Sequence, residues 1–331
     1  MLATVLISIA ERLRAVRGGW TTMMRAARLW TAAVFGGVLL AATACQAPPP
    51  GTDGDLVDDW PALAAPVFDV PAVGTCLDST ARKRFDPRFY RATPIACDQL
   101  HALEVVLIGT VQGNAADASA PPEAGSEAFQ AAYTACGKAA GDYVGGDWHD
   151  GLLGIEVQLP TSTPWKAGKR TYVCSIYGTS SAYGDMAFRT GSLKGALAGS
   201  APSALRCLEV VGDAGVDGWY ERIVTMTPLD CARPHGAEYV GSVQLTGGTL
   251  PADDVLRSTS IDLCWTLAAR FFGLTRERFN RRPDLLSIAW DGMDQQHWQT
   301  GDRYQRCFVL VSSGKKLTAT LKDLGTGKLP V

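Results

Sequence analysis

Two stretches of the chain carry apolar residues at the three- and four-residue spacing of an amphipathic helix. In residues 126–145 the apolar positions are Phe129, Ala132, Tyr133, Cys136, Ala140 and Tyr143. In residues 253–273 they are Val255, Ile261, Cys264, Leu267, Ala268 and Phe271. Each stretch closes on a glycine, Gly145 or Gly273, which is typical of a helix end. The pattern therefore predicts one helix in each half of the chain.

Short segments rich in Val, Ile, Leu and Tyr lie before and after each predicted helix, and this composition favours β-strands. The predicted strands around the first helix cover 73–78, 101–112, 154–160 and 170–178, and those around the second cover 204–211, 236–245, 285–290 and 304–312. Each half is therefore expected to be an α+β unit, in which a small antiparallel sheet packs against one helix.

The rare residue types show that the two halves are copies of one unit. Eight cysteines form two sets in the same order, with equivalent members 128 to 134 residues apart: Cys76, Cys97, Cys136 and Cys174, then Cys207, Cys231, Cys264 and Cys307. Two further patterns also recur. C-x3-H-x2-E contains His101 and Glu104, then His235 and Glu238, and W-x2-G-x-R-x3-C contains Trp165, Gly168 and Arg170, then Trp298, Gly301 and Arg303. We predict repeats at 71–198 and 199–325, followed by a tail at 326–331.

The N-terminal region is typical of an exported protein. Arg25 and Arg28 precede an apolar run over 29–42, and small residues lead to Cys45, as in a bacterial lipobox with Ala42 in the place where Leu is commonest. We predict a signal peptide at 23–45, with lipidation of Cys45, and an upstream extension at 1–22. Residues 46–70 are rich in Pro, Gly and Asp, which favours a tether. An ordinary secretory peptide, cleaved near Ala44, is the alternative.

Export also bears on the eight repeated cysteines, because thiols outside the cytoplasm usually pair. The C-x2-C spacing of zinc ribbons does not occur in the sequence. Four cysteines allow three connectivities in each repeat. We favour Cys76 with Cys97 and Cys207 with Cys231, which would join neighbouring strands. The remaining pairs, Cys136–Cys174 and Cys264–Cys307, would tie each helix to its closing strand.

Composition narrows the class of protein. The 331 residues are 47% hydrophobic and 19% charged, which fits a globular protein. The net charge of -2 gives no indication of the positively charged surface that binds nucleic acid. The motifs of a hydrolase nucleophile elbow, a zinc-protease helix or a phosphate-binding glycine loop do not occur in the sequence. We therefore expect no catalytic residue, no cofactor and no enzymatic activity.

The combined pattern resembles the septum formation domain family of actinobacterial envelope proteins, in two tandem copies. That family pattern runs G-x-C-L, C-x3-H-x2-E-V, a helix with Cys, W-x2-G-x-R-x3-C and a Ser-x-Lys-Gly-like tail. The first repeat matches it through its tail, "TGSLKG" at 190–195. The second departs at Arg206 and Tyr239, and "TATLKD" at 318–323 echoes the tail only loosely. The resemblance implies a membrane-anchored envelope protein and no defined reaction.

The histidine motifs allow a structural and a chemical interpretation. Residues three apart on a strand point to opposite faces, so His101 reaches Glu104, and His235 reaches Glu238, only across a bend. We favour a structural role, in which Glu104 pairs with Arg170, Glu238 pairs with Arg303, and each histidine bonds a turn or packs on tryptophan. Metal or small-ligand binding by these motifs is the alternative. A zinc site needs at least three protein ligands, and we expect no bound metal.

Trp165 and Trp298 are expected to fill the core, with stacking on a sugar or a partner as the alternative. We predict a non-enzymatic role in binding or scaffolding at the outer face of the cytoplasmic membrane, and the family resemblance implies a link between this role and septum formation. The expected partners are an envelope or divisome protein, or a cell-wall component, and not nucleic acid. An envelope hydrolase is the more distant alternative.

Overall fold

The structure is a computed structural model, and it describes residues 64–78, 93–182, 186–199, 201, 203–282, 287–291 and 293–331. The predicted extension, signal peptide, Cys45 and most of the tether lie outside the described residues. Residues 66–331 form one compact unit. Among the residues that the structure describes, no helix combines the length and the apolar character needed to cross a membrane.

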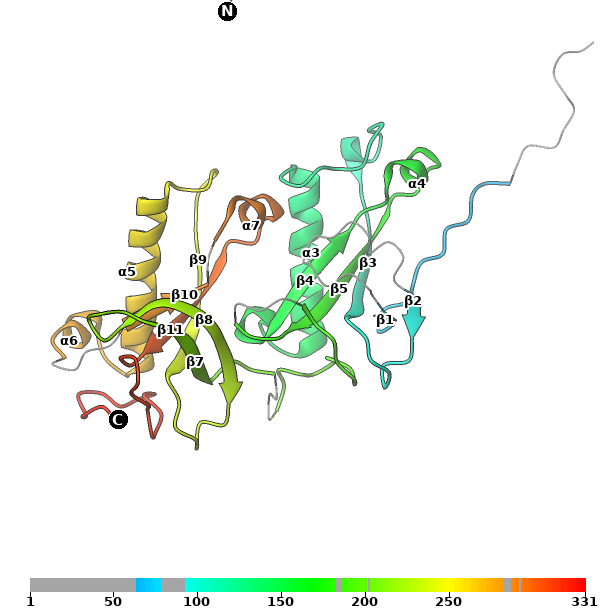
Figure 1. Ribbon diagram of the computed structural model, residues 1–331. Coiled ribbons are helices and arrows are strands. Elements are labelled where there is room, and N and C mark those ends of the chain that lie inside the picture. Colours follow the sequence, from blue (N-terminus) through cyan, green and yellow to red (C-terminus); the bar gives the residue numbers. More distant parts are fainter. Residues whose placement is uncertain are drawn as a thin grey trace, which may run out of the picture. The chain divides into compact units, whose positions relative to one another are not determined.

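The first sheet is antiparallel and has the strand order β2-β1-β3-β5-β4, with β6 paired to β5. Its strands are β1 (Cys76–Asp78), β2 (Thr93–Ile95), β3 (Leu103–Thr110), β4 (Leu153–Gln158), β5 (Thr171–Thr179) and β6 (Met186–Ala187). Its helical elements are η2 (Gly113–Ala115), α3 (Glu127–Val144), η3 (Trp148–Asp150) and α4 (Ser162–Lys166). Helix α3 lies along this sheet (Figure 1).

The second sheet has the order β10-β11-β9-β7-β8. Read from β8, its strands β8, β7, β9, β11 and β10 correspond to β2, β1, β3, β5 and β4, so the two sheets have the same topology. Its strands are β7 (Cys207–Ala214), β8 (Tyr220–Leu229), β9 (Ala237–Gln244), β10 (Ser287–Trp290) and β11 (Tyr304–Leu310). Its helices are α5 (Asp253–Phe271), α6 (Arg276–Asn280) and α7 (Gln295–Thr300). The predicted α+β class with two antiparallel sheets is confirmed.

Both sheets contain a β-bulge at the same place. The pairing of β3 with β5 skips Val106, and the pairing of β9 with β11 skips Val240. Both bulged residues are buried and belong to the cores under α3 and α5. A bulge bends and twists its strand. The register shift therefore repeats 134 residues later, together with the cysteines and histidines around it.

The four predicted disulfides are all confirmed: Cys76–Cys97, Cys136–Cys174, Cys207–Cys231 and Cys264–Cys307. The second and fourth join each long helix to strand β5 or β11, which lies next to the central strand of its sheet. The buried face of α5 carries Leu256, Ser260, Cys264 and Ala268, which follow one another at four-residue spacing. The sequence prediction placed Val255 on the buried face, which is wrong, because this side chain is 50% exposed.

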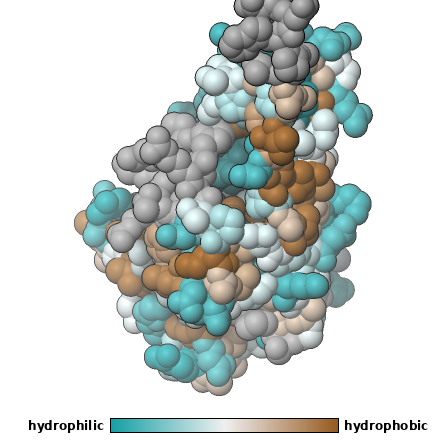
Figure 2. All heavy atoms as spheres, turned by 90° about the vertical axis from the view of Figure 1, so that its right-hand side faces the viewer, coloured by the Kyte–Doolittle hydropathy of each residue, from teal (hydrophilic) through white to brown (hydrophobic). Residues whose placement is uncertain are grey.

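The first sheet is covered on both faces. One face carries the core under α3, which includes Trp148 and Trp165. The other buries a smaller cluster of Leu77, Leu103, Val105, Tyr177 and Met186. A space-filling view of the side nearest β1 and β2 shows apolar residues gathered in patches among hydrophilic ones (Figure 2). Double coverage explains why β3 is almost continuously apolar rather than alternating.

Candidate functional site

His101 and Glu104 meet at the start of β3, because the chain bends at Ala102 between them. His101 precedes the strand and forms an isolated β-bridge with Arg189. Its Nε2 lies 3.4 Å from Glu104 Oε1, and its Nδ1 lies 2.8 Å from the Gln99 carbonyl oxygen. Both side chains are fully buried. The bend required by the sequence argument is present, and the histidine faces inward.

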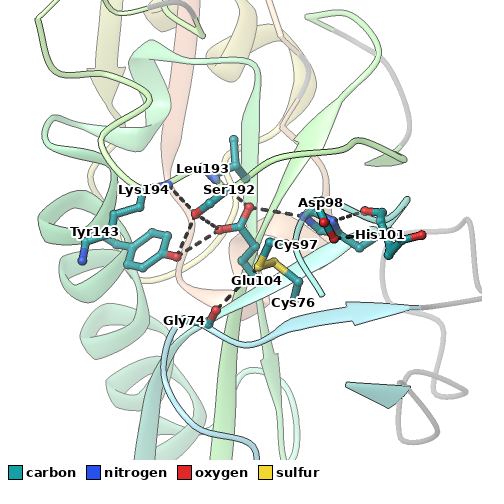
Figure 3. Close-up of a disulfide and its surroundings, with 11 residues drawn as sticks. Gly74, Cys76, Cys97, Asp98, His101, Glu104, Tyr143, Ser192, Leu193 and Lys194 are labelled. Carbon is teal, nitrogen blue, oxygen red and sulfur yellow. Dashed lines mark hydrogen bonds and ion pairs between the residues drawn. A yellow bond between two sulfur atoms is a disulfide. The ribbon is translucent and has the colours of Figure 1, made fainter. Parts of the chain in front are cut away.

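Glu104 accepts hydrogen bonds from three segments of the first repeat (Figure 3). Tyr143 on α3 donates its hydroxyl to Oε2 at 3.0 Å. Ser192 donates its hydroxyl to the same oxygen at 2.7 Å, and the backbone N–H of Leu193 donates to Oε1 at 2.6 Å. A buried carboxylate is tolerable only when its oxygens are satisfied in this way. Glu104 therefore fastens the tail segment to the strand and the helix.

The predicted pairing of Glu104 with Arg170 is wrong. Arg170 lies over the ring of Trp165, 4.0 Å from its centroid, and donates to the carbonyl oxygens of Ala116 and Trp165. Arg303 likewise lies 4.5 Å from the ring of Trp298 and donates to the Gly247 carbonyl. A guanidinium carries five donors in a planar fork, which suits several carbonyl acceptors and an aromatic face at once. The pairing predicted for Glu238 and Arg303 is wrong for the same reason.

The second repeat builds the same corner from equivalent residues. His235 Nε2 lies 2.9 Å from Glu238 Oε1, and both side chains are buried. Glu238 accepts the Thr320 hydroxyl at 3.1 Å and the Leu321 N–H at 3.0 Å. Thr320 and Leu321 thus take the places of Ser192 and Leu193. The loose echo "TATLKD" is the functional equivalent of the first tail, because a hydroxyl and the next backbone N–H are all that the carboxylate needs.

Electrostatics in the second corner favour a charged imidazole. The His235 Nδ1 also contacts a carbonyl oxygen, that of Arg233, at 2.8 Å, so both ring nitrogens face acceptors. Burial alone would lower the pKa of His235, but the hydrogen bonds to Glu238 and to the Arg233 carbonyl raise it above its ordinary value. An imidazolium with two protons satisfies both acceptors. The raised pKa therefore favours the protonated, ion-paired form of this buried corner.

The corners hold potential metal donors, but these donors are already engaged. The ligand atoms of Cys76, His101 and Glu104 lie within 4.8 Å of one another, as do those of Cys207, His235 and Glu238. Both cysteines are oxidised in disulfides, and a thiolate is the form that binds metal. The Ser192 hydroxyl bonds Glu104 and not the imidazole, so the group does not have the order of a Ser–His–acid triad. The geometry of the corners supports a structural role.

The two Trp-Gly-Arg loops also bury their aromatic residues. Trp165 is 1% exposed and donates its indole N–H to the Ala118 carbonyl at 2.7 Å. Trp298 is 3% exposed and donates to the Gly248 carbonyl at 3.4 Å. Gly168 and Gly301 adopt φ of +95° and +91°, which a residue with a side chain rarely adopts. The prediction that these tryptophans fill the core is confirmed.

A cleft that the sequence analysis did not predict lies where the two repeats meet. It has a volume of about 780 Å³. Its walls come from α3 and the segment leading to η3 in the first repeat, and from the connection of α7 to β11 in the second. Residues from both repeats line it, among them Tyr133, Asp147, His149, Asp302 and Tyr304. Ionisable groups from both repeats converge in it, a usual property of ligand sites.

His149 occupies the centre of the ionisable groups in this cleft. Its Nδ1 lies 2.6 Å from Asp147 Oδ1, and its Nε2 lies 3.6 Å from Asp302 Oδ1 in the other repeat. Its ring stacks on Tyr304, with 4.1 Å between ring centroids. Burial lowers the pKa of His149, but the two carboxylates outweigh this effect and raise it above its ordinary value. The hydrogen bond to His149 in turn lowers the pKa of Asp147.

Arg306 on β11 joins the repeats beneath the cleft. It donates Nε to the His149 carbonyl and Nη2 to the Leu153 carbonyl, each at 2.8 Å. Its Nη1 lies 3.7 Å from Asp291, whose pKa burial raises to about 6 despite the guanidinium. Tyr133 donates its hydroxyl to Asp302 at 3.0 Å across the same junction. The bonds between the repeats are therefore numerous and mostly involve charged groups.

One sequence signal pointed to this junction. Asp302 lies between the glycine and the arginine of the motif W-x2-G-x-R, at the position where the first repeat has Lys169. A charge reversal inside an otherwise repeated motif indicates that the two copies face different surroundings. His149 itself has no partner in frame in the second repeat, because His297 lies elsewhere in the unit and bonds Asp294.

The family model for septum formation matches residues 73–307. The chain belongs to the septum formation family. The match runs from just before Cys76 to Cys307, so it includes the histidine and glutamate of both corners and the residues that line the cleft, but not Thr320 and Leu321. Family membership associates the protein with cell division at the envelope. No curated protein and no solved structure matches the chain.

Proposed function

We propose that this member of the septum formation family is an exported, lipid-anchored protein that binds a partner outside the cytoplasmic membrane during cell division. The partner is an envelope or divisome protein, or a cell-wall component. The cleft between the repeats is the observation that carries the binding role. It is roomy, it draws its ionisable groups from both repeats, and bonds such as that of Tyr133 to Asp302 hold its walls together.

Preformed walls favour binding, because little conformational entropy is lost when a ligand enters. Asp302 is fixed by the Tyr133 hydroxyl, and His149 is fixed through its own carbonyl by Arg306. The disulfide Cys136–Cys174 ties α3, one wall of the cleft, to strand β5 of its sheet. The duplicated corners have a different task, which is to close each repeat on its own tail.

The proposed role is non-enzymatic. A nucleophile needs a base within hydrogen-bond reach. Thr134, which lines the cleft, instead donates its hydroxyl to the Gln130 carbonyl at 2.9 Å. In the first corner, Ser192 donates its hydroxyl to the Glu104 carboxylate, which also accepts the Leu193 N–H and contacts His101. The bonds of these two hydroxyls support a structural rather than a catalytic role for them.

The anchor is proposed from the sequence. The basic residues, the apolar run and Cys45 have the order of a lipoprotein signal peptide, and residues 46–70 provide a polar tether. Such a tether holds the unit of 66–331 at a distance from the bilayer while keeping it near the membrane.

Photo-cross-linking tests the binding role. A photoreactive amino acid placed at Thr134, which is exposed and lines the cleft, should capture a specific envelope component in living cells. The matched control places it at Thr259, which is exposed on α5 and does not line the cleft. Capture from Thr134 alone supports the proposal. Equal capture from both positions, or from neither, refutes it.

The anchor needs its own experiment. Growth with a labelled fatty acid should label the protein, and Cys45→Ser should abolish the label and release the protein from the membrane fraction. Unchanged membrane association of the unlabelled variant would show that another segment holds the protein.

A further inference from the structure

The four disulfides differ in the burial of their cysteines. The two that tie a helix to a strand, the helix disulfides, have fully buried cysteines at both ends: Cys136, Cys174, Cys264 and Cys307. The two beside the histidines, the corner disulfides, each join a buried cysteine to a partly exposed one: Cys76 to Cys97, and Cys207 to Cys231. A thiol in solution can therefore reach Cys97 or Cys231 in the folded protein.

The buried cysteine of each corner disulfide lies beside the histidine and the glutamate. His101 and Glu104 both have a ligand atom within 4.8 Å of Cys76 Sγ, and Figure 3 shows the disulfide next to this carboxylate. The second repeat forms the same group from equivalent residues: Cys207, His235 and Glu238. A disulfide sulfur is not a metal ligand, but a thiolate is. Reduction would therefore supply the ligand that each oxidised corner lacks.

The spacing of these donors suits a tetrahedral zinc ion. With bonds of about 2.0–2.2 Å to nitrogen and oxygen and about 2.3 Å to sulfur, zinc separates an N and an O ligand by about 3.3–3.4 Å, and an S and an O ligand by about 3.6 Å. His101 Nε2 lies 3.4 Å from Glu104 Oε1. In the second corner, Cys207 Sγ lies 3.8 Å from Glu238 Oε1, and His235 Nε2 lies 2.9 Å from the same oxygen. Shifts of a few tenths of an ångström would place the donors around one ion.

Hydrogen bonds already orient each histidine as in a zinc site. His101 Nδ1 lies 2.8 Å from the Gln99 carbonyl oxygen, and His235 Nδ1 lies 2.8 Å from that of Arg233. A carbonyl oxygen only accepts, so Nδ1 carries a hydrogen, and a neutral ring has its Nε2 lone pair directed at the carboxylate. A metal-bound histidine usually donates its other ring N–H to such a partner. The fold therefore selects the tautomer in which Nε2 can bind zinc.

We propose that each reduced corner binds one zinc ion through the thiolate of Cys76 or Cys207, the histidine Nε2 and the glutamate carboxylate. The thiolate of Cys97 or Cys231 is the fourth protein ligand, because its side chain can rotate once the disulfide is broken. Four protein ligands are the usual number in a structural zinc site. Zinc then replaces the disulfide as the cross-link of the corner. This inference concerns the corners and is independent of the cleft.

The donor set favours zinc over other common cations. Magnesium and calcium prefer oxygen ligands alone, whereas zinc binds thiolate, imidazole and carboxylate. The carboxylate also has the outer hydrogen bonds that hold a ligand in place, because Glu104 accepts the hydroxyls of Tyr143 and Ser192. These two groups need not move when the ion binds.

The reduced corner arises in two ways. Every chain is synthesised with free thiols, and its disulfides form only in an oxidising compartment. A dithiol reductant can also regenerate the thiols: one of its thiolates attacks Cys97 Sγ and the Cys76 thiolate leaves. The second thiol of the reductant then attacks the mixed disulfide, which releases Cys97 and leaves the reductant as a disulfide. Zinc binding transfers the protons of the two cysteine thiols, and any proton on Nε2, to solvent.

One variant tests the site without a reductant. Cys97→Ser leaves Cys76 as a free thiol beside His101 and Glu104, so three protein ligands remain and water takes the fourth position. Competition with a chromogenic chelator should show one zinc ion bound to this variant. Cobalt(II) in place of zinc should give the near-ultraviolet charge-transfer absorption of a thiolate–cobalt bond. The oxidised wild type should give neither signal.

The controls separate the complete site from a free thiol. Cys97→Ser combined with His101→Gln keeps the thiol of Cys76 and should lose the cobalt absorption. The matched disulfide control is Cys174→Ser, which frees Cys136, a residue in no group of metal donors among the described residues. This variant should bind no metal. Ser192→Ala in the Cys97→Ser background should weaken zinc binding by about tenfold, the lower end for loss of an outer-shell partner. Melting temperatures and thiol counts verify each variant.

A second experiment uses the wild-type protein and so does not depend on the folding of any variant. Mild reduction with a phosphine, followed by alkylation and peptide mapping, should label the four corner cysteines before any cysteine of a helix disulfide. After removal of the phosphine, this partly reduced protein should bind one zinc ion per repeat. Zinc should protect the corner thiols from alkylation, and magnesium should not.

Four results would overturn the inference: no zinc binding by the partly reduced wild type, cobalt binding without the thiolate absorption, binding that survives His101→Gln, or equal binding by Cys174→Ser. Reduction of the helix disulfides first would refute the difference in access between the two kinds of disulfide. None of these results bears on capture of an envelope partner from Thr134, so the binding role of the cleft is tested separately.

Discussion

Replacement of Glu104 tests the idea that one buried carboxylate closes each repeat on its own tail. Two variants differ in what they leave behind. Glu104→Gln keeps one carbonyl oxygen, and Glu104→Leu keeps none. The four groups around the side chain respond differently, because the hydroxyls of Tyr143 and Ser192 can switch from donating to accepting a hydrogen bond. The Leu193 N–H can only donate.

The magnitude follows from these contacts. In Glu104→Gln the oxygen can stay with Leu193 and His101, while the amide donates to the two hydroxyls. The variant loses mainly the charge-assisted part of the bonds, about 1–2 kcal/mol of the free energy of unfolding. In Glu104→Leu the Leu193 N–H and the His101 ring lose their acceptor in a fully buried corner. At about 1–3 kcal/mol for each stranded group, we expect a loss of about 4 kcal/mol.

Urea unfolding of the oxidised protein measures the global effect, and hydrogen exchange of the Leu193 amide measures the local one. The exchange of this amide should accelerate strongly in Glu104→Leu and only slightly in Glu104→Gln. Glu221→Gln, at an exposed position of β8, is the control and should change neither quantity. Equal losses in the two Glu104 variants, or unchanged exchange at Leu193, would refute the reasoning.

Three more predictions concern the junction, the disulfides and pH. Arg306→Met should lower the free energy of unfolding by about 3 kcal/mol at pH 8, the lower end of the range for a broken buried pair, because it strands the partly buried Asp291 carboxylate. The loss should be smaller at pH 5, where Asp291 is protonated, and urea titrations at both pH values measure this. Replacing Cys264 and Cys307 with alanine should cost about 4 kcal/mol, the loop-closure value for a separation of 43 residues, measured by the same titration. Because the pKa of His235 is raised in the folded state, protonated His235 contributes to the free energy of unfolding. This contribution is complete below about pH 6.5 and is lost as pH rises through the folded-state pKa. His235→Gln should therefore flatten the fall in stability above neutral pH, and an unchanged slope would contradict this assignment.

Much of the fold could be predicted from the sequence because it was written twice. Agreement between the two copies identified both helices and most of the strand segments along the chain, and it supported the favoured cysteine pairs, whereas the order of the strands in each sheet came only from the structure. The sequence located both histidine corners but gave Glu104 and Glu238 the wrong partners. The frame C-x3-H-x2-E does not reveal that Ser192 and Leu193, 88 and 89 residues away along the chain, bond Glu104. Arg170 was a reasonable partner by charge, yet Trp165 and two backbone carbonyls engage it.

By itself, the sequence determined what lies within one repeat. Spacing of apolar residues, glycine stops and cysteine order are local or duplicated signals, and each was visible in the chain. The tertiary structure alone decided how the two copies meet. The cleft depends on His149, Asp302 and Arg306, which have no equivalent pairing within either repeat, so comparison of the two copies indicated only the charge reversal at Asp302 and not its partners. Their proximity arises from the packing of one repeat on the other, where burial and opposite charge, rather than any repeated spacing, bring these groups together.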